Sequence, residues 1–379
     1  MQRTEHPLLS PSLGAQKTLI SFQYGAADAR PKVYIQASLH AEELPGMLVA
    51  HHLRTQLEAA ERDGRLLGQV VLVPAANPIG LAQRLDHRAM GRFEFDTAEN
   101  FNRHYPDLAE AVLQEAPTVL GRDAQTNVAA VRQLVKAWLH RWQPDTELVS
   151  LRRELLLLAH DADTVIDLHC DAEAALHLYS EEACWPALEP LARLLGCQAV
   201  LLARESGGGP FDERLSGLWW QLAARLKDAG HSFPLPQACA STTVELRGEA
   251  DVSHEHAQAD SAAIMDYLCH IGAIRADVAP VLPPLPCEPT PLAGSQTLRS
   301  PLPGVLALRA RPGQKVSVGE VVADVIDPTS PGDSRVHTVR AEVAGVLYAT
   351  VRERYLVAGG EVGKIAGAVP FRSGDLLGA

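Results

Sequence analysis

The chain has 379 residues, more than the roughly 250–300 at which a single core usually stops growing, so two domains are expected. Hydrophobic residues make up 46% and charged residues 21%, an ordinary globular composition that excludes disordered and fibrous classes. The formal net charge of −12 argues against nucleic acid or an anionic membrane as a partner, because both favour a basic surface.

The amino terminus has no apolar stretch of signal-peptide length, and no later run approaches the ~20 residues of a membrane span. We therefore expect a soluble, cytoplasmic protein. The six cysteines form no C-x-x-C pair, which argues against a cysteine-rich zinc module and against a disulfide framework. They are expected to be free and mostly buried.

The first part of the chain predicts a strand, a helix and a second strand. Residues 32–39 and 69–74 are short apolar runs rich in β-branched residues, which is typical of buried strands. Between them Val49, Leu53 and Leu57 recur at four-residue spacing, as in a helix with one apolar stripe. This order indicates a βαβ unit.

The middle of the chain predicts a helical insertion at about 106–160, followed by alternating strands and helices. Strands are expected at 163–168, 199–203 and 242–246. Helices are expected around 219–226 and 264–271. Strands that alternate with helices favour an α/β sheet covered on both faces.

The composition changes at 278–291, where prolines prevent a helix or a central strand. Short β-rich runs broken by Pro-Gly and Gly-Gly follow, which favours a small all-β domain. We predict a first domain at 1–277, a linker at 278–297 and a β-rich second domain at 298–379.

Metal-competent side chains follow two of the predicted strands, where open α/β sheets build their sites. His40 and Glu43 lie three residues apart across a strand-to-helix turn, and His169 comes directly after the strand predicted at 163–168. H-x-x-E alone matches many ordinary surface or core histidines. Together, two histidines and one carboxylate leave a fourth tetrahedral position open, as a catalytic zinc site requires.

Other polar residues leave alternatives open. Glu245 lies in a buried strand, where a carboxylate is costly without a partner, and an ion pair with Arg247 or another cation is the simpler interpretation of this segment alone. Arg92 and Arg103 could grip a carboxylate, with Asn102 as a further donor, or could be solvated loop charges. Asp167 could orient His169 or cap the strand end.

Two motifs favour structural interpretations. Residues 253–256 (SHEH) resemble a metal cluster but precede a helical pattern, so a solvated helix start is expected. Residues 207–210 (GGGP) lack the G-K-[ST] of a phosphate-binding loop and predict a flexible loop near the site. The absence of a G-x-S-x-G motif argues against a serine hydrolase.

The motifs occur in a recognisable order: H-x-x-E at 40–43, N-P at 77–78, G-R-F at 91–93, N-x-N-R at 100–103, D-L-H at 167–169 and V-E-L at 244–246. This order resembles the succinylglutamate desuccinylase and aspartoacylase family, a branch of the zinc carboxypeptidase superfamily, over about residues 32–271. The C-terminal region resembles a subgroup whose second domain is a barrel-sandwich similar to biotinyl and lipoyl carriers.

The resemblance implies an α/β fold, with a zinc-carboxypeptidase-like mixed sheet covered by helices on both faces and a small C-terminal all-β barrel-sandwich domain. It implies one Zn²⁺ per chain on His40, Glu43 and His169, with Glu245 as general base. Asn102 and Arg103 would grip a substrate carboxylate.

Arg92 matches the arginine that stabilises the oxyanion in the family, although Arg88 and Arg84 lie close by in the sequence. Ala41-Glu42 stands where many relatives have glycine after the first zinc histidine. This departure leaves both ligands in place, so it affects the expected substrate class more than the metal.

The expected function is a zinc-dependent deacylase that cleaves the amide bond of a small N-acyl amino acid, such as an N-succinyl or N-acetyl amino acid. A metallocarboxypeptidase acting on short peptides is the alternative enzyme. A non-catalytic binding protein on the same scaffold is the alternative from another class. The expected partner is a small carboxylate-bearing substrate, and a homo-oligomer remains open.

Overall fold

The computed structural model describes residues 1–377, apart from the side chains of residues 333 and 334. Its body is built on a nine-stranded mixed sheet with the strand order β1-β2-β4-β3-β7-β11-β9-β10-β12. These strands are β1 Gln2–Pro7, β2 Thr18–Tyr24, β3 Lys32–Ala37, β4 Gln69–Val73, β7 Thr164–Asp171, β9 His177–Glu181, β10 Ala199–Ala203, β11 Ala240–Gly248 and β12 Thr290–Pro291. The central strands β4, β3, β7 and β11 are parallel, so their carboxyl ends meet at one edge.

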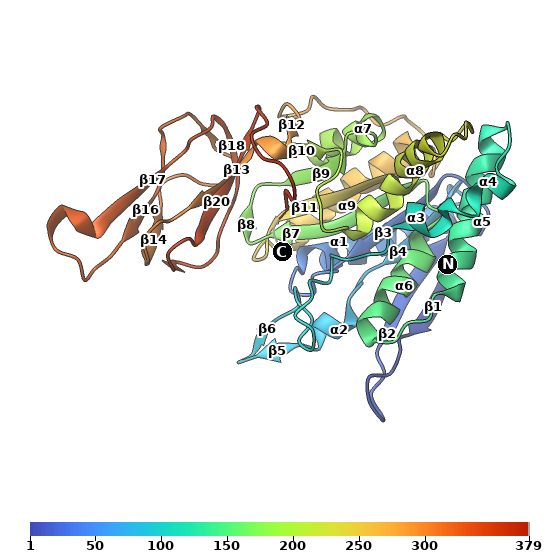
Figure 1. Cartoon of the computed structure of the whole chain (residues 1–379), viewed down its shortest axis with the longest axis horizontal. Helices are drawn as coiled ribbons and strands as arrows, with labels where there is room; N and C mark the ends of the chain where they lie inside the picture. Colours follow the sequence, from blue (N-terminus) through green and yellow to red (C-terminus); the bar gives the residue numbers. More distant parts are fainter. Residues whose placement is uncertain (378–379) are drawn as a thin grey trace.

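Helices cover both faces of this sheet because its inner strands are apolar on both sides. On β3, Val33 and Ile35 face one core while Tyr34 faces the other. The helices packed on the first face are α1 Pro45–Arg62, α7 Trp185–Leu195 and α9 His254–His270. Those on the second face are α3 Leu108–Leu113, α4 Ala116–Val119, α5 Ala124–Arg141, α6 Glu147–Ala159 and α8 Phe211–Asp228. The fold class predicted from the sequence is therefore confirmed (Figure 1).

The predicted helical insertion corresponds to α3, α4, α5 and α6. Val131 and Val135 of α5 and Leu151 and Leu155 of α6 are buried in the same core as Tyr34 of the sheet. These helices therefore cover one face of the sheet. Side-chain caps fix the starts of both long helices, since Asp123 accepts from Thr126 N and Thr146 from Val149 N.

The C-terminal region forms two small β-sheets around a separate core. The first contains β13 Ser295–Arg299, β20 Glu361–Gly367, β18 Gly345–Thr350 and β15 Lys315–Val316, and the second contains β17 Val336–Arg340, β16 Val321–Ile326, β14 Gly304–Leu308 and β19 Tyr355–Leu356. Strand β8, Glu173–Ala174 of the body, pairs with β18. The β-rich region lies at one end of the molecule (Figure 1). The domain boundaries remain a prediction. Strand β13 begins at Ser295, three residues before the predicted start of the second domain at 298.

The structure confirms the predicted helix start at 253–256 and the free cysteines. Ser253 caps α9 by accepting a hydrogen bond from His256 N, so the SHEH segment is a helix start as expected. All six cysteines are free and four of them are buried. Among the described residues, no helix has the length and apolar character needed to cross a membrane.

Candidate metal centre

The turn after β3 places the first two predicted metal ligands. Ser38 has a positive φ of 58°, rare for a residue with a side chain, and its hydroxyl donates to the carbonyl of Glu43 at 2.6 Å. The side chain of Asn77 donates to the carbonyl of Leu39 at 2.8 Å. These bonds hold the H-x-x-E segment in a fixed turn at the carboxyl edge of the sheet.

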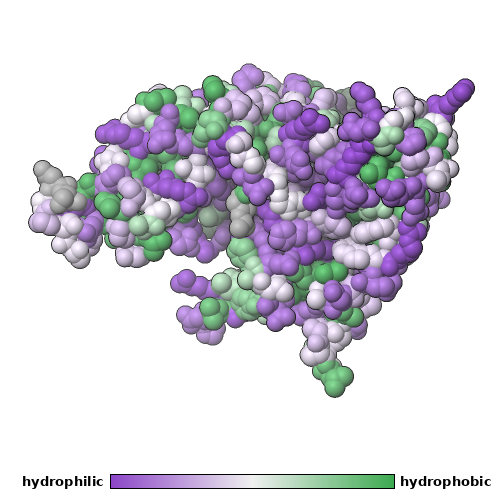
Figure 2. Space-filling view, in the orientation of Figure 1, coloured by the Kyte–Doolittle hydropathy of each residue, from purple (hydrophilic) through white to green (hydrophobic). Residues whose placement is uncertain are grey.

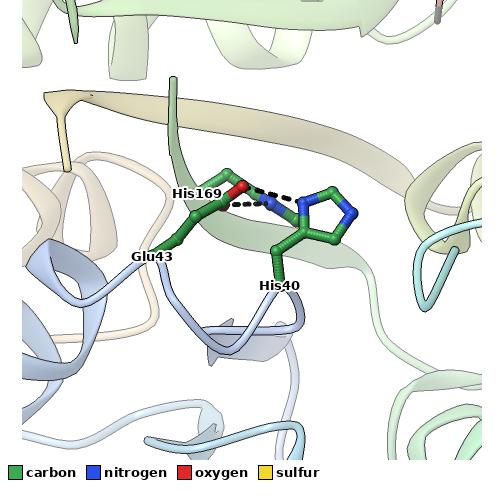
Figure 3. A group of neighbouring side chains, drawn as sticks. All are labelled: His40, Glu43 and His169. Atoms are coloured by element: carbon green, nitrogen blue, oxygen red, sulfur yellow. Dashed lines mark hydrogen bonds and ion pairs between the residues drawn. The ribbon is translucent and has the colours of Figure 1, made fainter. Parts of the chain in front are cut away.

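His40, Glu43 and His169 converge at this edge (Figure 3). The Nδ1 atom of His40 lies 2.8 Å from Oε1 of Glu43, and Nδ1 of His169 lies 2.7 Å from Oε2 of the same carboxylate. One potential ligand atom from each residue falls within 4.8 Å of the others, and all three side chains are buried. The structure therefore brings the predicted ligand set together.

A second layer of contacts holds the two imidazoles. Nε2 of His40 lies 2.9 Å from Oδ1 of Asn100, which orients the ring so that Nδ1 faces the cluster. Nε2 of His169 lies 3.1 Å from the Asp167 carboxylate, although the approach is poorly aligned for a hydrogen bond. Asn100 belongs to the N-x-N-R motif, but its contact with His40 could not be predicted from the motif.

The donor set fits a zinc ion. Two imidazole nitrogens and one carboxylate are the ligand types that catalytic zinc sites use, and three protein ligands leave a position for water or substrate. Burial lowers the pKa of His40 to about 4, with Arg92 adding to the effect, so this ligand is neutral near pH 7. Burial alone would raise the pKa of Glu43, but His40 and His169 outweigh it and keep the carboxylate ionised.

Zinc binding is expected to weaken as the pH falls. Burial opposes protonation of His169, but the carboxylates of Asp167 and Glu43 outweigh it and hold its pKa well above the ordinary value. A metal must displace that proton, so below this pKa the apparent zinc affinity should fall about tenfold per pH unit. Competition with a chelating indicator at several pH values would measure the slope. A pH-independent affinity between pH 6 and 8 would contradict the assignment of His169 as a ligand.

Removal of the Asn100 side chain should weaken the site without removing a ligand. Because Oδ1 of Asn100 contacts Nε2 of His40, Asn100→Ala is expected to lower zinc affinity by about 10–100-fold. The matched control is Asn127→Ala, which removes a buried asparagine that bonds Gly121 and Pro234, outside the cluster. Equal zinc affinities for the two variants would show that Asn100 does not orient His40.

Glu245 lies beside the cluster on β11, in register with His169 on β7. Burial, followed by the neighbouring charge of Glu43, raises its pKa to about 8 in the metal-free chain. No described residue bonds its buried Oε2 atom. The predicted ion pair between Glu245 and Arg247 is not formed. Arg247 has a positive φ of 67° and donates instead to Asp260 at 2.7 and 2.9 Å.

Arg92 lies at the open side of the cluster. Its Nη1 atom is 3.3 Å from Oε1 of Glu43 and 3.4 Å from Nδ1 of His40, and its side chain is 42% exposed. Arg84 and Arg88 are exposed on the hairpin formed by β5 (Arg84–Leu85) and β6 (Arg88–Ala89), which projects from the body (Figure 1). Of these three arginines, Arg92 is the one placed at the cluster.

Asn102 and Arg103 line the same cavity as His40, Glu43 and His169. Oδ1 of Asn102 accepts from the backbone N–H of Phe211, which fixes the start of α8 against this segment. Arg103 donates to the Asn102 carbonyl at 2.8 Å and is only 8% exposed. Arg103 is therefore not a solvated loop charge.

One cavity of about 430 Å³ joins all seven predicted site residues. Residues of the β-rich region also line it, including Arg299, Lys364 and Arg372. Lys364 donates to Asp171 of β7 at 2.8 Å, so the two parts of the chain meet in the wall of the cavity. The molecule is hollowed between the β-rich region and the body (Figure 2).

Comparison with known families identifies this arrangement. The profile of the succinylglutamate desuccinylase/aspartoacylase catalytic domain matches residues 29–271. The chain belongs to this family. It is a family of deacylases and hydrolases. The matched range of this chain contains all three predicted metal ligands and Glu245. A comparison with curated proteins found no match.

Solved structures of other proteins share the whole architecture. A family protein from Shewanella amazonensis is 26% identical, with a TM-score of 0.83 over 97% of this chain and 98% of the other. One from Shewanella frigidimarina is 24% identical, with a TM-score of 0.82 over 97% of each chain. The product-bound ectoine utilization protein of Ruegeria pomeroyi is 15% identical, with a TM-score of 0.66 over 96% of this chain and 95% of the other. The β-rich region is therefore part of the shared fold.

Proposed function

We propose that the protein is a zinc-dependent deacylase that hydrolyses the amide bond of a small N-acyl amino acid. The observation that carries the proposal is the convergence of His40, Glu43 and His169, with Glu245 in register beside them. Family membership supports amide hydrolysis as the reaction class. The reaction adds one water across the C–N bond and releases a carboxylic acid and an amine.

His40, Glu43 and His169 would hold the metal through Nδ1, a carboxylate oxygen and Nδ1. When bound, zinc supplies a Lewis acid that polarises the amide carbonyl and lowers the pKa of water toward ~7. The backbone N–H of Cys170 donates to Oε2 of Glu43 at 3.1 Å and helps to hold that carboxylate in place.

Glu245 is the proposed general base. It would take a proton from the attacking water and return it to the leaving amine, which otherwise departs as a poor leaving group. The positive charge of a bound metal would lower the raised pKa of Glu245 and favour the carboxylate form that accepts a proton. Its unpartnered Oε2 atom supports this role.

The two arginines would act on two different negatively charged groups of the substrate. Arg92, next to the cluster, would donate to the oxygen of the amide carbonyl as negative charge develops there. The guanidinium of Arg103, with Asn102 beside it, would hold the substrate carboxylate. A small anionic substrate can bind this acidic protein because these cations are local to the cavity.

A substrate panel tests the proposal against its alternatives. Zinc-loaded protein is incubated with N-acetyl and N-succinyl amino acids and with unblocked tripeptides, and the released amine is quantified. Turnover of the acyl amino acids is the expected result. Cleavage of tripeptides alone would favour a metallocarboxypeptidase. A zinc-loaded protein that cleaves neither class would favour a binding protein on this scaffold.

A further inference from the structure

The triple-glycine loop Gly207–Gly209 lies beside the cavity and is closely packed, in contrast to the flexible loop predicted from the sequence. All three glycines have positive φ values, of 90°, 69° and 61°. A Cβ atom added to Gly207 would lie 2.1 Å from Oδ1 of Asp375, and one added to Gly208 would lie 2.8 Å from Cδ of Arg103. Glycine is therefore required here for two reasons: the backbone has positive φ, and the side chains of Asp375 and Arg103 leave no room for a Cβ atom at Gly207 and Gly208.

The segment Arg372–Leu377, which we call the tail, lies on this loop. The N–H of Leu376 donates to the carbonyl of Ser206 at 2.8 Å. The guanidinium of Arg372 donates to the carbonyl of Leu376 at 2.6 Å and to that of Ser295 at 3.3 Å. The tail is thus attached to the body through Ser206 and to the β-rich region through Ser295.

Apolar packing fixes the tail against one wall of the cavity. Leu376 is 9% exposed and belongs to a cluster with Leu201, Leu292 and Tyr348. Leu377 packs against the same cluster. Arg372, Asp375, Leu376 and Leu377 all line the cavity that contains the metal ligands. The tail therefore forms part of the wall that a substrate would meet.

We propose that the tail is a specificity-determining wall that limits how long a substrate the cavity accepts. The inference rests on the proposed function for the identity of the substrate. Asp375 of the tail packs against Gly207, and Arg103 packs against the adjacent Gly208. The tail therefore lies next to the residue that would hold the substrate carboxylate. A cavity of about 430 Å³ closed in this way fits a small molecule. Peptides that extend past this wall would collide with Leu376 and Leu377.

The loop offers a matched set of variants. Gly207→Ala places a methyl group against Asp375 and should displace the tail. Gly208→Ala places one against Arg103 and should instead raise KM for short substrates. Gly230→Ala is the control, because Gly230 has a φ of 84° with nothing within 4 Å of the added atom, so it adds the backbone strain alone. A stop codon in place of Ser373 removes the tail beyond Arg372.

The readout is the ratio of kcat/KM for an N-acetyl tripeptide to that for an N-acetyl amino acid. Tail deletion and Gly207→Ala should each raise this ratio about tenfold or more, and Gly230→Ala should leave it unchanged. Zinc content and the thermal unfolding midpoint identify variants that have lost the fold. A folded, zinc-loaded deletion variant with the wild-type ratio would overturn the proposal.

A second measurement separates this inference from the proposed function. If the wild-type protein cleaves no acyl compound, the proposed function fails, and hydrogen exchange at the Leu376 amide then tests the docked tail. Because this N–H donates to Ser206, it should exchange at least tenfold more slowly in wild type than in Gly207→Ala. Equally fast exchange in both proteins would show that the tail does not occupy the cavity wall.

Discussion

Glu245→Gln is expected to reduce amide hydrolysis by about 10²–10⁴-fold while the protein still binds one zinc ion per chain. Glutamine has the size and shape of glutamate but cannot accept the proton of the attacking water. The metal ligands are untouched, because Glu245 lies beside the cluster formed by His40, Glu43 and His169. Steady-state kinetics and metal analysis on the same preparation measure both quantities.

Glu181→Gln is the matched control for this variant. Glu181 is also a buried glutamate, on the neighbouring strand β9, and burial raises its pKa to about 7. It accepts a hydrogen bond from Trp220 Nε1, outside the metal cluster. The control should keep nearly all of its turnover. If Glu245→Gln kept most of its activity as well, Glu245 could not be the general base.

His169→Ala is expected to abolish stable zinc binding, and activity with it. Structural zinc sites with four ligands bind with about 10–16 kcal/mol, so one lost ligand should cost about 3–4 kcal/mol, or roughly 10²–10³-fold in affinity. The substitution also leaves the buried carboxylate of Glu43 without its partner at 2.7 Å. A competition titration with a zinc indicator measures the loss.

His160→Ala is the control for His169→Ala, because it removes a buried histidine at the end of α6 that bonds the carbonyl of Leu157. It should keep wild-type zinc affinity even if its stability falls. Wild-type affinity in His169→Ala would mean that the metal site lies elsewhere in the chain.

The metal ligands could be predicted from the sequence because His169 lies near the carboxyl end of one apolar strand, and His40 and Glu43 follow another. Parallel pairing brings these two strand ends to the same edge of the sheet. Strands β3 and β7 are adjacent and parallel, so His40 and His169 meet wherever the sheet forms. The helices predicted around Val49 and in 106–160 were recognisable for a similar reason, since their apolar stripes face the sheet.

The sequence did not reveal features that depend on distant contacts. Strand β1 is a largely exposed edge strand, and β9 is a short strand inserted antiparallel to β11, so neither has a long apolar run. The tail reaches the cavity through contacts with Ser206 and Gly207, more than 160 positions earlier in the chain. No local pattern predicts such packing.

Arg247 shows how a local backbone irregularity can redirect a side chain. It lies two residues after Glu245, so regular pleating would place both side chains on one face of the strand. The register of β11 shifts between Glu245 and Gly248, and Arg247 turns toward Asp260 of α9. This bulge leaves Glu245 facing the cavity without a cationic partner from its own strand.

The zinc content of the purified protein is the decisive measurement for the proposed metal site. We expect about one equivalent of zinc per chain, either as isolated or after reconstitution with zinc and removal of the excess. Less than about a tenth of an equivalent under both conditions would show that the buried His40, Glu43 and His169 side chains do not form a metal site.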